Sequence, residues 1–306
     1  MVKSIMFYVT LVPLLYLVLS FAALLVSYVF NSLRYCIFVR FFGHVLDWKK
    51  SFIILSGVMF VSSFFPKGGM VLAKPYLTHY TTRNGLKGAF FATVFEQLFE
   101  TAWQVVALPL MLFFFSEKVI IKSAVTTAEV VFLLFSLMLI LFLLRKRIFR
   151  FIFAHKDKIP HFLKKRLAKY NFTKENMLKF SQQMREFIKD YKRNFLIVCL
   201  TALIFFSNPL AFYLLFLGAQ IHVTFFEIII VYWVSLIIGK ISGIPGGFAA
   251  RDLTSIGMLV SLGVASDLAI SMSILFRLLT LVVPTVIGGP VLLVFLKKIV
   301  RKHKSG

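Results

Sequence analysis

Two acidic residues, Glu96 and Glu100, stand one helical turn apart within the apolar segment 88–115. Residues four apart share one face of a helix, so the two carboxylates point the same way. A charge near the bilayer centre costs at least about 2.5–3.5 kcal/mol on insertion scales, so such groups normally pair or face a cavity. Close carboxylates also resist joint ionisation, which suits them to hold a proton or a cationic headgroup. The alternative is that they only join neighbouring helices.

A positive charge, Arg277, lies inside another apolar segment, 268–296. The number of residues from Pro245 to Arg277 is nearly the same as the number from Pro66 to Glu96. Equivalent positions in the two halves of the chain therefore hold opposite charges. A guanidinium presents a planar fork of N–H donors that matches a phosphate. We expect Arg277 to pair with the acidic residues of the first half, to hold a lipid phosphate, or to alternate between the two.

Two glycine-rich turns precede further charged residues. Arg251 and Asp252 follow the second turn, where glycines allow close approach of a ligand and a helix start offers N–H groups to an anion. The alternative is that these two residues pair with each other. Lys67 and Lys74 belong to the first turn and are expected near the inner surface, with Lys74 reaching headgroups or substrate. The residues predicted to form structural turns are Pro66, Gly68, Gly69, Pro245, Gly246 and Gly247 at these two sites, and Pro284 and Gly288 further along the chain.

Motifs for other chemistry are absent from the sequence. The six histidines are dispersed, and Cys36 and Cys199 lie far apart without a metal-binding spacing. There is no phosphate-binding loop, dinucleotide fingerprint or nucleophile elbow. We therefore expect no metal, no cofactor and no catalytic residue, and the pattern favours a transporter over an enzyme.

The composition indicates a membrane protein. Of 306 residues, 59% are hydrophobic and 15% charged, whereas soluble domains have about 45–50% apolar and about 25% charged residues. The net charge of +23 is interpreted as membrane orientation and contact with anionic lipids, not as nucleic-acid binding. A secreted, fibrous or disordered chain is excluded.

Five apolar segments are long enough to cross about 30 Å of hydrocarbon, the first of them as an uncleaved span. Two shorter apolar segments, 52–65 and 225–239, end at the glycine-rich turns and are predicted to be first arms of re-entrant hairpins. Segment 253–265 supplies the second arm of the second hairpin. The five predicted spans are 5–30, 88–115, 125–144, 195–217 and 268–296.

Basic residues predict the orientation. The linker 145–193 and the tail 297–304 are rich in Lys and Arg and are placed in the cytoplasm. The same rule places 31–50 and 66–87 inside, so 52–65 must enter from the cytoplasm and return. Segments 116–124 and 218–224 are placed outside, so the second hairpin enters from the outer face.

Opposed hairpins imply an inverted repeat. Residues 5–115 and 195–296 have the same order of span, short arm, glycine turn, second arm and span, with opposite sense across the membrane. Inverted repeats with broken helices are typical of transporters that bind substrate near the midplane. We predict one integral membrane domain, 1–306, all α-helical, with about five spans and two re-entrant hairpins, its halves joined by 125–144 and 145–193.

These motifs resemble the lysylphosphatidylglycerol synthase/flippase transmembrane-domain family over nearly the whole chain. The stretch from Pro245 to Asp252, then Arg277, Pro284 and Gly288, is similar to the family pattern PGGLGvRE…R…P…G. In the first half, Lys74-Pro-Tyr-Leu and Glu96-Gln-Leu-Phe-Glu100 are similar to its (K/R).Y.L and ER..D motifs. This chain departs from those patterns at Met70, Gln97, Glu100, Ala249 and Asp252.

The resemblance implies a fold that moves lipids between leaflets, with the flippase part alone and no aminoacyltransferase domain. Together with the charged residues it predicts a flippase of the cell membrane, acting on a phospholipid or lipid-linked headgroup. Its expected partners are anionic or lipid-linked membrane lipids and a biosynthetic enzyme. The alternatives are an intramembrane transferase with Glu96 or Asp252 as general base, and a non-catalytic accessory subunit. The predicted substrate-binding residues are Lys74, Glu96, Glu100, Arg251, Asp252 and Arg277.

Overall fold

The computed structural model describes residues 12–43, 45–64, 67–82, 85–115, 186–187, 189–242 and 247–294. Within these ranges the chain forms eight α-helices and one π-helical turn, which confirms the all-helical class. The elements are α2 (Leu14–Phe41), α3 (Trp48–Phe64), α4 (Lys67–Thr82), α5 (Leu86–Phe115), α9 (Tyr191–Gly218), α10 (Phe225–Ile241), α11 (Phe248–Ser261), α12 (Ser266–Val283) and η3 (Pro284–Gly288).

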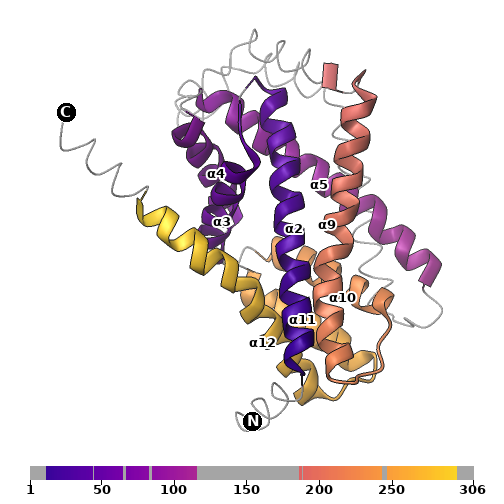
Figure 1. Cartoon of the computed structure of the whole chain (residues 1–306). Helices are drawn as coiled ribbons and strands as arrows, with labels where there is room; N and C mark the ends of the chain where they lie inside the picture. Colours follow the sequence, from indigo (N-terminus) through magenta and orange to yellow (C-terminus); the bar gives the residue numbers. More distant parts are fainter. Residues whose placement is uncertain are drawn as a thin grey trace, which may run out of the picture.

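Helices α2 and α9 pack side by side along the long axis of the molecule (Figure 1). They are antiparallel, because Ser20 near the start of α2 donates to the Ala211 carbonyl near the end of α9, at 2.6 Å. A Cβ atom on Gly218 would lie 2.8 Å from Tyr16, so a glycine is needed where the helices are closest. This pair is the frame on which the other helices pack.

Two helix pairs, α3/α4 and α10/α11, lie toward opposite ends of that frame in Figure 1. The order of elements is the same in both halves: a 28-residue helix, a pair, and a long helix. The pairs have 17 and 16 residues in the first half and 17 and 14 in the second. The final helices are also matched, with 30 residues in α5 and 29 in the segment Ser266–Val294.

In the pair α10/α11, specific residues mark where each helix begins. Helix α10 begins with a capping box, in which the Thr224 hydroxyl accepts from the Glu227 amide and the Glu227 carboxylate accepts from the Thr224 amide. Helix α11 begins after Gly247, whose φ of 65° suits glycine. These residues define where α10 and α11 begin.

Two apolar clusters, each formed mainly by one half of the chain, hold the bundle together. In the first, Tyr35, Phe38 and Val39 of α2 pack with α3 and with Phe95 of α5. In the second, Phe212 and Phe216 of α9 pack with α10, α11 and α12. In a membrane bundle such side chains stabilise the packing of helices through van der Waals contact.

Among the described residues, three helical segments are long and apolar enough to cross a membrane: Leu14–Phe41, Tyr191–Gly218 and Ser266–Val294. They contain most of the predicted spans 5–30, 195–217 and 268–296. The predicted span 88–115 is the single helix α5. The predicted linking span 125–144 and most of the linker 145–193 fall outside the described residues.

The structure corrects the predicted end of the first span. The sequence placed 31–50 in an internal loop on the strength of its basic residues, but α2 continues to Phe41. Arg34 lies inside that helix with 1% of its side chain exposed. The helix continues because Tyr35, Phe38 and Val39 are buried in the first cluster and because Arg34 finds carboxylate partners inside the bundle.

Candidate functional site

A cavity of about 330 Å³ lies within the bundle and is lined by residues of both halves. Ser62 and Ser63, in the last turn of α3, reach it from the first helix pair. Lys240 at the end of α10 and Gly247 before α11 reach it from the second pair. The ends of both pairs therefore meet at one cavity, although the pairs lie toward opposite ends of the α2 and α9 frame.

Glu96 of α5 is at the centre of a buried ion network. One carboxylate oxygen, Oε1, accepts from Arg34 of α2 at 3.5 Å. The other, Oε2, accepts a short hydrogen bond from the Lys74 ammonium of α4. Only 1% of each of the three side chains is exposed. Three helices are thus joined through one carboxylate in an apolar setting, where loss of one partner leaves an uncompensated charge.

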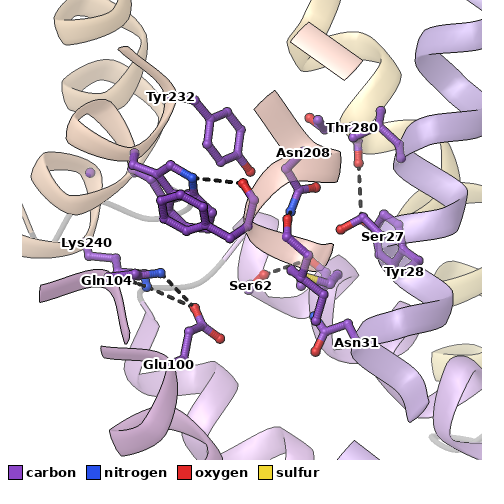
Figure 2. Close-up of a pocket in the computed structure, with 18 of the residues that line it drawn as sticks. Ser27, Tyr28, Asn31, Ser62, Glu100, Gln104, Asn208, Tyr232, Lys240 and Thr280 are labelled. Atoms are coloured by element: carbon purple, nitrogen blue, oxygen red, sulfur yellow. Dashed lines mark hydrogen bonds and ion pairs between the residues drawn. The ribbon is translucent and has the colours of Figure 1, made fainter. Parts of the chain in front are cut away.

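Glu100 joins the first half of the chain to the second. Its Oε2 accepts from Arg34 at 3.1 Å, and its Oε1 accepts from Lys240 of α10 at 3.1 Å. Gln104, one turn further along α5, donates to Glu100 at 3.3 Å and accepts from Lys240 at 2.9 Å. Figure 2 shows Glu100, Gln104 and Lys240 grouped at one side of the cavity.

Aromatic and hydroxyl side chains hold the Lys74 ammonium of the network in position. The Lys74 ammonium lies 3.9 Å from the centroid of the Tyr35 ring, which is a cation–π geometry. The Tyr35 hydroxyl lies within hydrogen-bond distance of Thr78 at 2.8 Å and Thr93 at 3.3 Å. These contacts hold the Tyr35 ring in place under the ammonium.

Two arginines of the second half, Arg251 and Arg277, also line the cavity. The Arg251 guanidinium lies 5.1 Å from the centroid of the Tyr232 ring. Asp252 lies beside both arginines in a small adjoining pocket. Guanidinium groups at the wall of a cavity are suited to bidentate contacts with a phosphate.

Neutral polar groups form much of the remaining wall. Tyr28 and Asn31 of α2 and Asn208 of α9 lie across the cavity from the cluster of Glu100 and Lys240 (Figure 2). Trp233 donates to the Phe205 carbonyl at 3.1 Å, and its ring stacks on Phe205 at 4.7 Å between centroids. The cavity therefore combines charged, amide and hydroxyl groups with an aromatic wall.

The predicted turn residues have different outcomes. Gly247 lies close to the α10 backbone, since a Cβ atom there would be 3.0 Å from the Gly239 oxygen. Gly288 contacts α3 so closely that its Cβ would be 2.2 Å from the Ser56 carbonyl oxygen. Pro284 begins the π-helical turn and lines the cavity. Gly68 and Gly69 lie in the first turn of α4, while Pro66, Pro245 and Gly246 fall outside the described residues.

The structure brings five of the six predicted substrate-binding residues to one cavity and places the sixth in the adjoining pocket. The expectation that the Lys74 ammonium reaches headgroups at the inner surface is wrong, because the side chain is buried against Glu96. Its aliphatic stem and ammonium are drawn inward by the carboxylate and the Tyr35 ring. The cavity residues are Lys74, Glu96, Glu100, Arg251 and Arg277; the pocket residue is Asp252.

Sequence reasoning did not assign Arg34 and Lys240 to the site. Arg34 was counted as a loop charge, and Lys240 as part of the break that ends a short arm. The signal for Arg34 was the apolar stretch 35–39 that follows it and continues the helix beyond the charge. The pairing predicted for the two glutamates was with Arg277, whereas the structure gives them Arg34, Lys74 and Lys240.

Metal ligation is not supported by the described side chains, among which no group of three or more His, Cys, Asp or Glu residues could hold an ion. An all-helical bundle with three membrane-length apolar segments and a charged internal cavity defines a multi-pass membrane protein. A family model described as the lysylphosphatidylglycerol synthase TM region matches residues 4–288, so the chain belongs to that family.

Two relatives are UPF0104 membrane proteins of archaea. The one from Methanocaldococcus jannaschii is 24% identical over 303 residues, which cover 94% of this chain and 87% of the relative. The one from Pyrococcus horikoshii is 29% identical over 148 residues, which cover 47% of this chain and 41% of the relative. No solved structure matches the chain.

Proposed function

We propose that this protein is a lipid translocase, which moves the headgroup of a phospholipid or lipid-linked substrate between leaflets through the internal cavity. The observation that carries the proposal is the ion network at the wall of a cavity reached by both helix pairs, in which Arg34, Lys74 and Glu96 are buried and Glu100 and Lys240 are partly exposed. A polar headgroup meets its largest barrier in hydrocarbon, and a polar cavity replaces its lost hydration.

The arrangement of the helix pairs supports a transport mechanism. We infer that α3/α4 and α10/α11 are re-entrant pairs that enter from opposite membrane faces and belong to an inverted repeat. The matched order and lengths of the elements and the antiparallel α2 and α9 support this inference. In such folds, movement of one repeat against the other exposes the central site to each side in turn.

The direction of insertion follows from the basic residues. We place the linker 145–193 and the tail 297–304 in the cytoplasm, because both are rich in Lys and Arg. On this placement the connection between α2 and α3 is cytoplasmic and the connection between α9 and α10 is external. The membrane is the cell membrane.

The alternative of an intramembrane transferase is less well supported at Glu96. A general base must come within hydrogen-bond reach of the proton that it takes, and each Glu96 oxygen already faces a buried cation of the protein. A transferase would also form a new product from its lipid. Mass spectrometry of lipids incubated with purified protein separates the two functions, because translocation leaves every lipid chemically unchanged.

Reconstitution tests the proposal directly. Purified protein is placed in vesicles that contain a trace of acyl-labelled lipid, and an impermeant reductant bleaches the label in the outer leaflet. A translocase carries label from the inner leaflet to the outer, so bleaching proceeds beyond one half. Bleaching that stops at one half for anionic, zwitterionic and polyprenyl lipids alike would contradict the proposal. Vesicles holding heat-unfolded protein serve as the control.

A further inference from the structure

We propose that the headgroup accepted by this cavity is anionic, bears hydroxyl groups and carries no ammonium. This inference rests on the proposed function for its transport consequence, but the binding preference it names can be measured without transport. It is argued from the charge at the cavity wall, from the state of the carboxylates and from the orientation of the neutral hydroxyls.

The cavity wall has a surplus of positive charge. The described residues that line it include five cations and two carboxylates, those of Glu96 and Glu100. If the adjoining Asp252 is included, a surplus of two positive charges remains. Charges held away from water are unfavourable unless they are compensated, so a ligand that brings negative charge is stabilised here and a cationic one is repelled. The five cations are Arg34, Lys74, Lys240, Arg251 and Arg277.

The carboxylates of the cavity are already occupied by the protein's own donors. The Glu96 oxygens accept from Arg34 and Lys74, one each. The Glu100 oxygens accept from Arg34 on one side and from Lys240 and Gln104 on the other. All four oxygens therefore have a partner. The charges of the two carboxylates are thus already compensated by cations of the protein, and a lipid ammonium would add an uncompensated positive charge beside them.

One buried donor at the cavity wall has no partner among the described residues. The Arg34 side chain lines the cavity, is 1% exposed, and has an Nε–H group with no hydrogen-bond partner among the described residues. A buried donor without a partner costs about 1–3 kcal/mol. Arg251 adds a guanidinium whose face is held by the Tyr232 ring. A phosphate oxygen supplies the acceptor that such donors need.

The neutral hydroxyls of the wall are suited to a hydroxylated headgroup. Ser62 and Ser63 both donate to the Met59 carbonyl, and Thr101 donates to the Gln97 carbonyl. Each hydroxyl has thereby used its single proton and keeps lone pairs as acceptors. All three residues line the cavity. The O–H donors of glycerol, inositol or a sugar complement these oxygens, whereas a choline group has no donor to offer.

Binding is measured with water-soluble short-chain lipids and purified protein in detergent. Tritiated dihexanoyl phosphatidylinositol is bound to immobilised protein, and unlabelled dihexanoyl lipids compete for the site. We expect phosphatidylinositol and phosphatidylglycerol to bind at least about tenfold more tightly than phosphatidylcholine and lysyl-phosphatidylglycerol. Equal affinity for all four lipids, tighter binding of the lysyl lipid, or no specific binding of any would overturn the inference.

Paired variants locate the binding to the cavity. Arg251→Gln is expected to weaken phosphatidylinositol binding by about tenfold or more. Lys50→Gln removes a cation that is exposed and paired with Asp47, and it should leave binding unchanged. Equal losses in the two variants would indicate attraction by overall charge and would contradict a cavity site.

The vesicle assay separates this inference from the function on which it rests. Selective binding of anionic lipids without movement of any lipid between leaflets would refute the translocase and leave the headgroup preference standing. Movement of the lysyl lipid at a rate equal to phosphatidylinositol would leave the translocase standing and refute the preference. Faster movement of phosphatidylinositol and phosphatidylglycerol than of the lysyl lipid supports both.

Discussion

Lys74 of α4 and Glu96 of α5 form a buried ion pair at the cavity wall, with 1% of each side chain exposed. Arg34 of α2 completes the site at the second Glu96 oxygen. Buried pairs contribute little net stability compared with apolar residues, yet removal of one partner is costly. The proposed translocation accounts for such a pair in an apolar bundle, because it requires charge at the cavity wall.

The first prediction concerns this pair. Glu96→Gln leaves the Lys74 ammonium and the Arg34 guanidinium without their shared carboxylate, so it should lower the free energy of unfolding by about 3–5 kcal/mol. Lys74→Met should also lower the free energy of unfolding. The loss in the double variant should be smaller than the sum of the two single losses, because each single variant leaves a buried charge without its partner and the double variant removes both charges. Unfolding in detergent, followed by circular dichroism, measures all three. Strict additivity would show that the two residues do not interact.

The second prediction separates transport from stability at Lys240. Its bond to Glu100 is partly exposed, so Lys240→Gln should change the free energy of unfolding by only about 0.2–1 kcal/mol. Because the bond joins α10 to α5 across the cavity, lipid movement should fall about tenfold. Lys50→Gln, at an exposed pair with Asp47, is the matched control and should alter neither quantity. Unchanged flip rates in the Lys240 variant would exclude this contact from the transport site.

Much of the fold could be predicted because its signals are local. Apolar runs of membrane length and glycine-rich breaks predict the long helices and the two helix pairs. The polar face of α5 predicts Glu96 and Glu100 as site residues. The partners of those carboxylates could not be predicted, because pairing depends on which helices pack together. Arg34 shows the difficulty: a cation in an apolar run predicts a helix end unless a carboxylate from a distant helix lies beside it.

The third prediction concerns the contact between η3 and α3. Gly288→Ala would place a Cβ atom 2.2 Å from the Ser56 carbonyl oxygen, so the two elements must separate, at a cost of about 1–3 kcal/mol or more. The neighbouring Gly289 offers a control, since its Cβ would meet only the Phe60 ring at 3.6 Å. Gly289→Ala should therefore be neutral or slightly stabilising. Thermal unfolding of both variants tests the contact, which an equal melting temperature for the two would refute.

The fourth prediction tests the opposed entry of the helix pairs. In a background with Cys36→Ala and Cys199→Ala, single cysteines replace Ser63 at the end of α3 and Ser242 after α10. Both serines donate to a carbonyl of their own helix, at 2.9 and 3.0 Å, so the two substitutions remove similar bonds. We expect an impermeant maleimide to reach position 63 from the cytoplasmic side and position 242 from the outer side.

Two further cysteines calibrate the sides in that experiment. Val45 lies exposed between α2 and α3, and Gln220 lies exposed between α9 and α10. With basic loops inside, Val45→Cys should react only from the cytoplasm and Gln220→Cys only from outside. If positions 63 and 242 were both labelled from one side while these controls behaved as expected, the helix pairs would enter from the same face. The cavity would then open to a single compartment, and an inverted repeat could not carry a headgroup across the membrane.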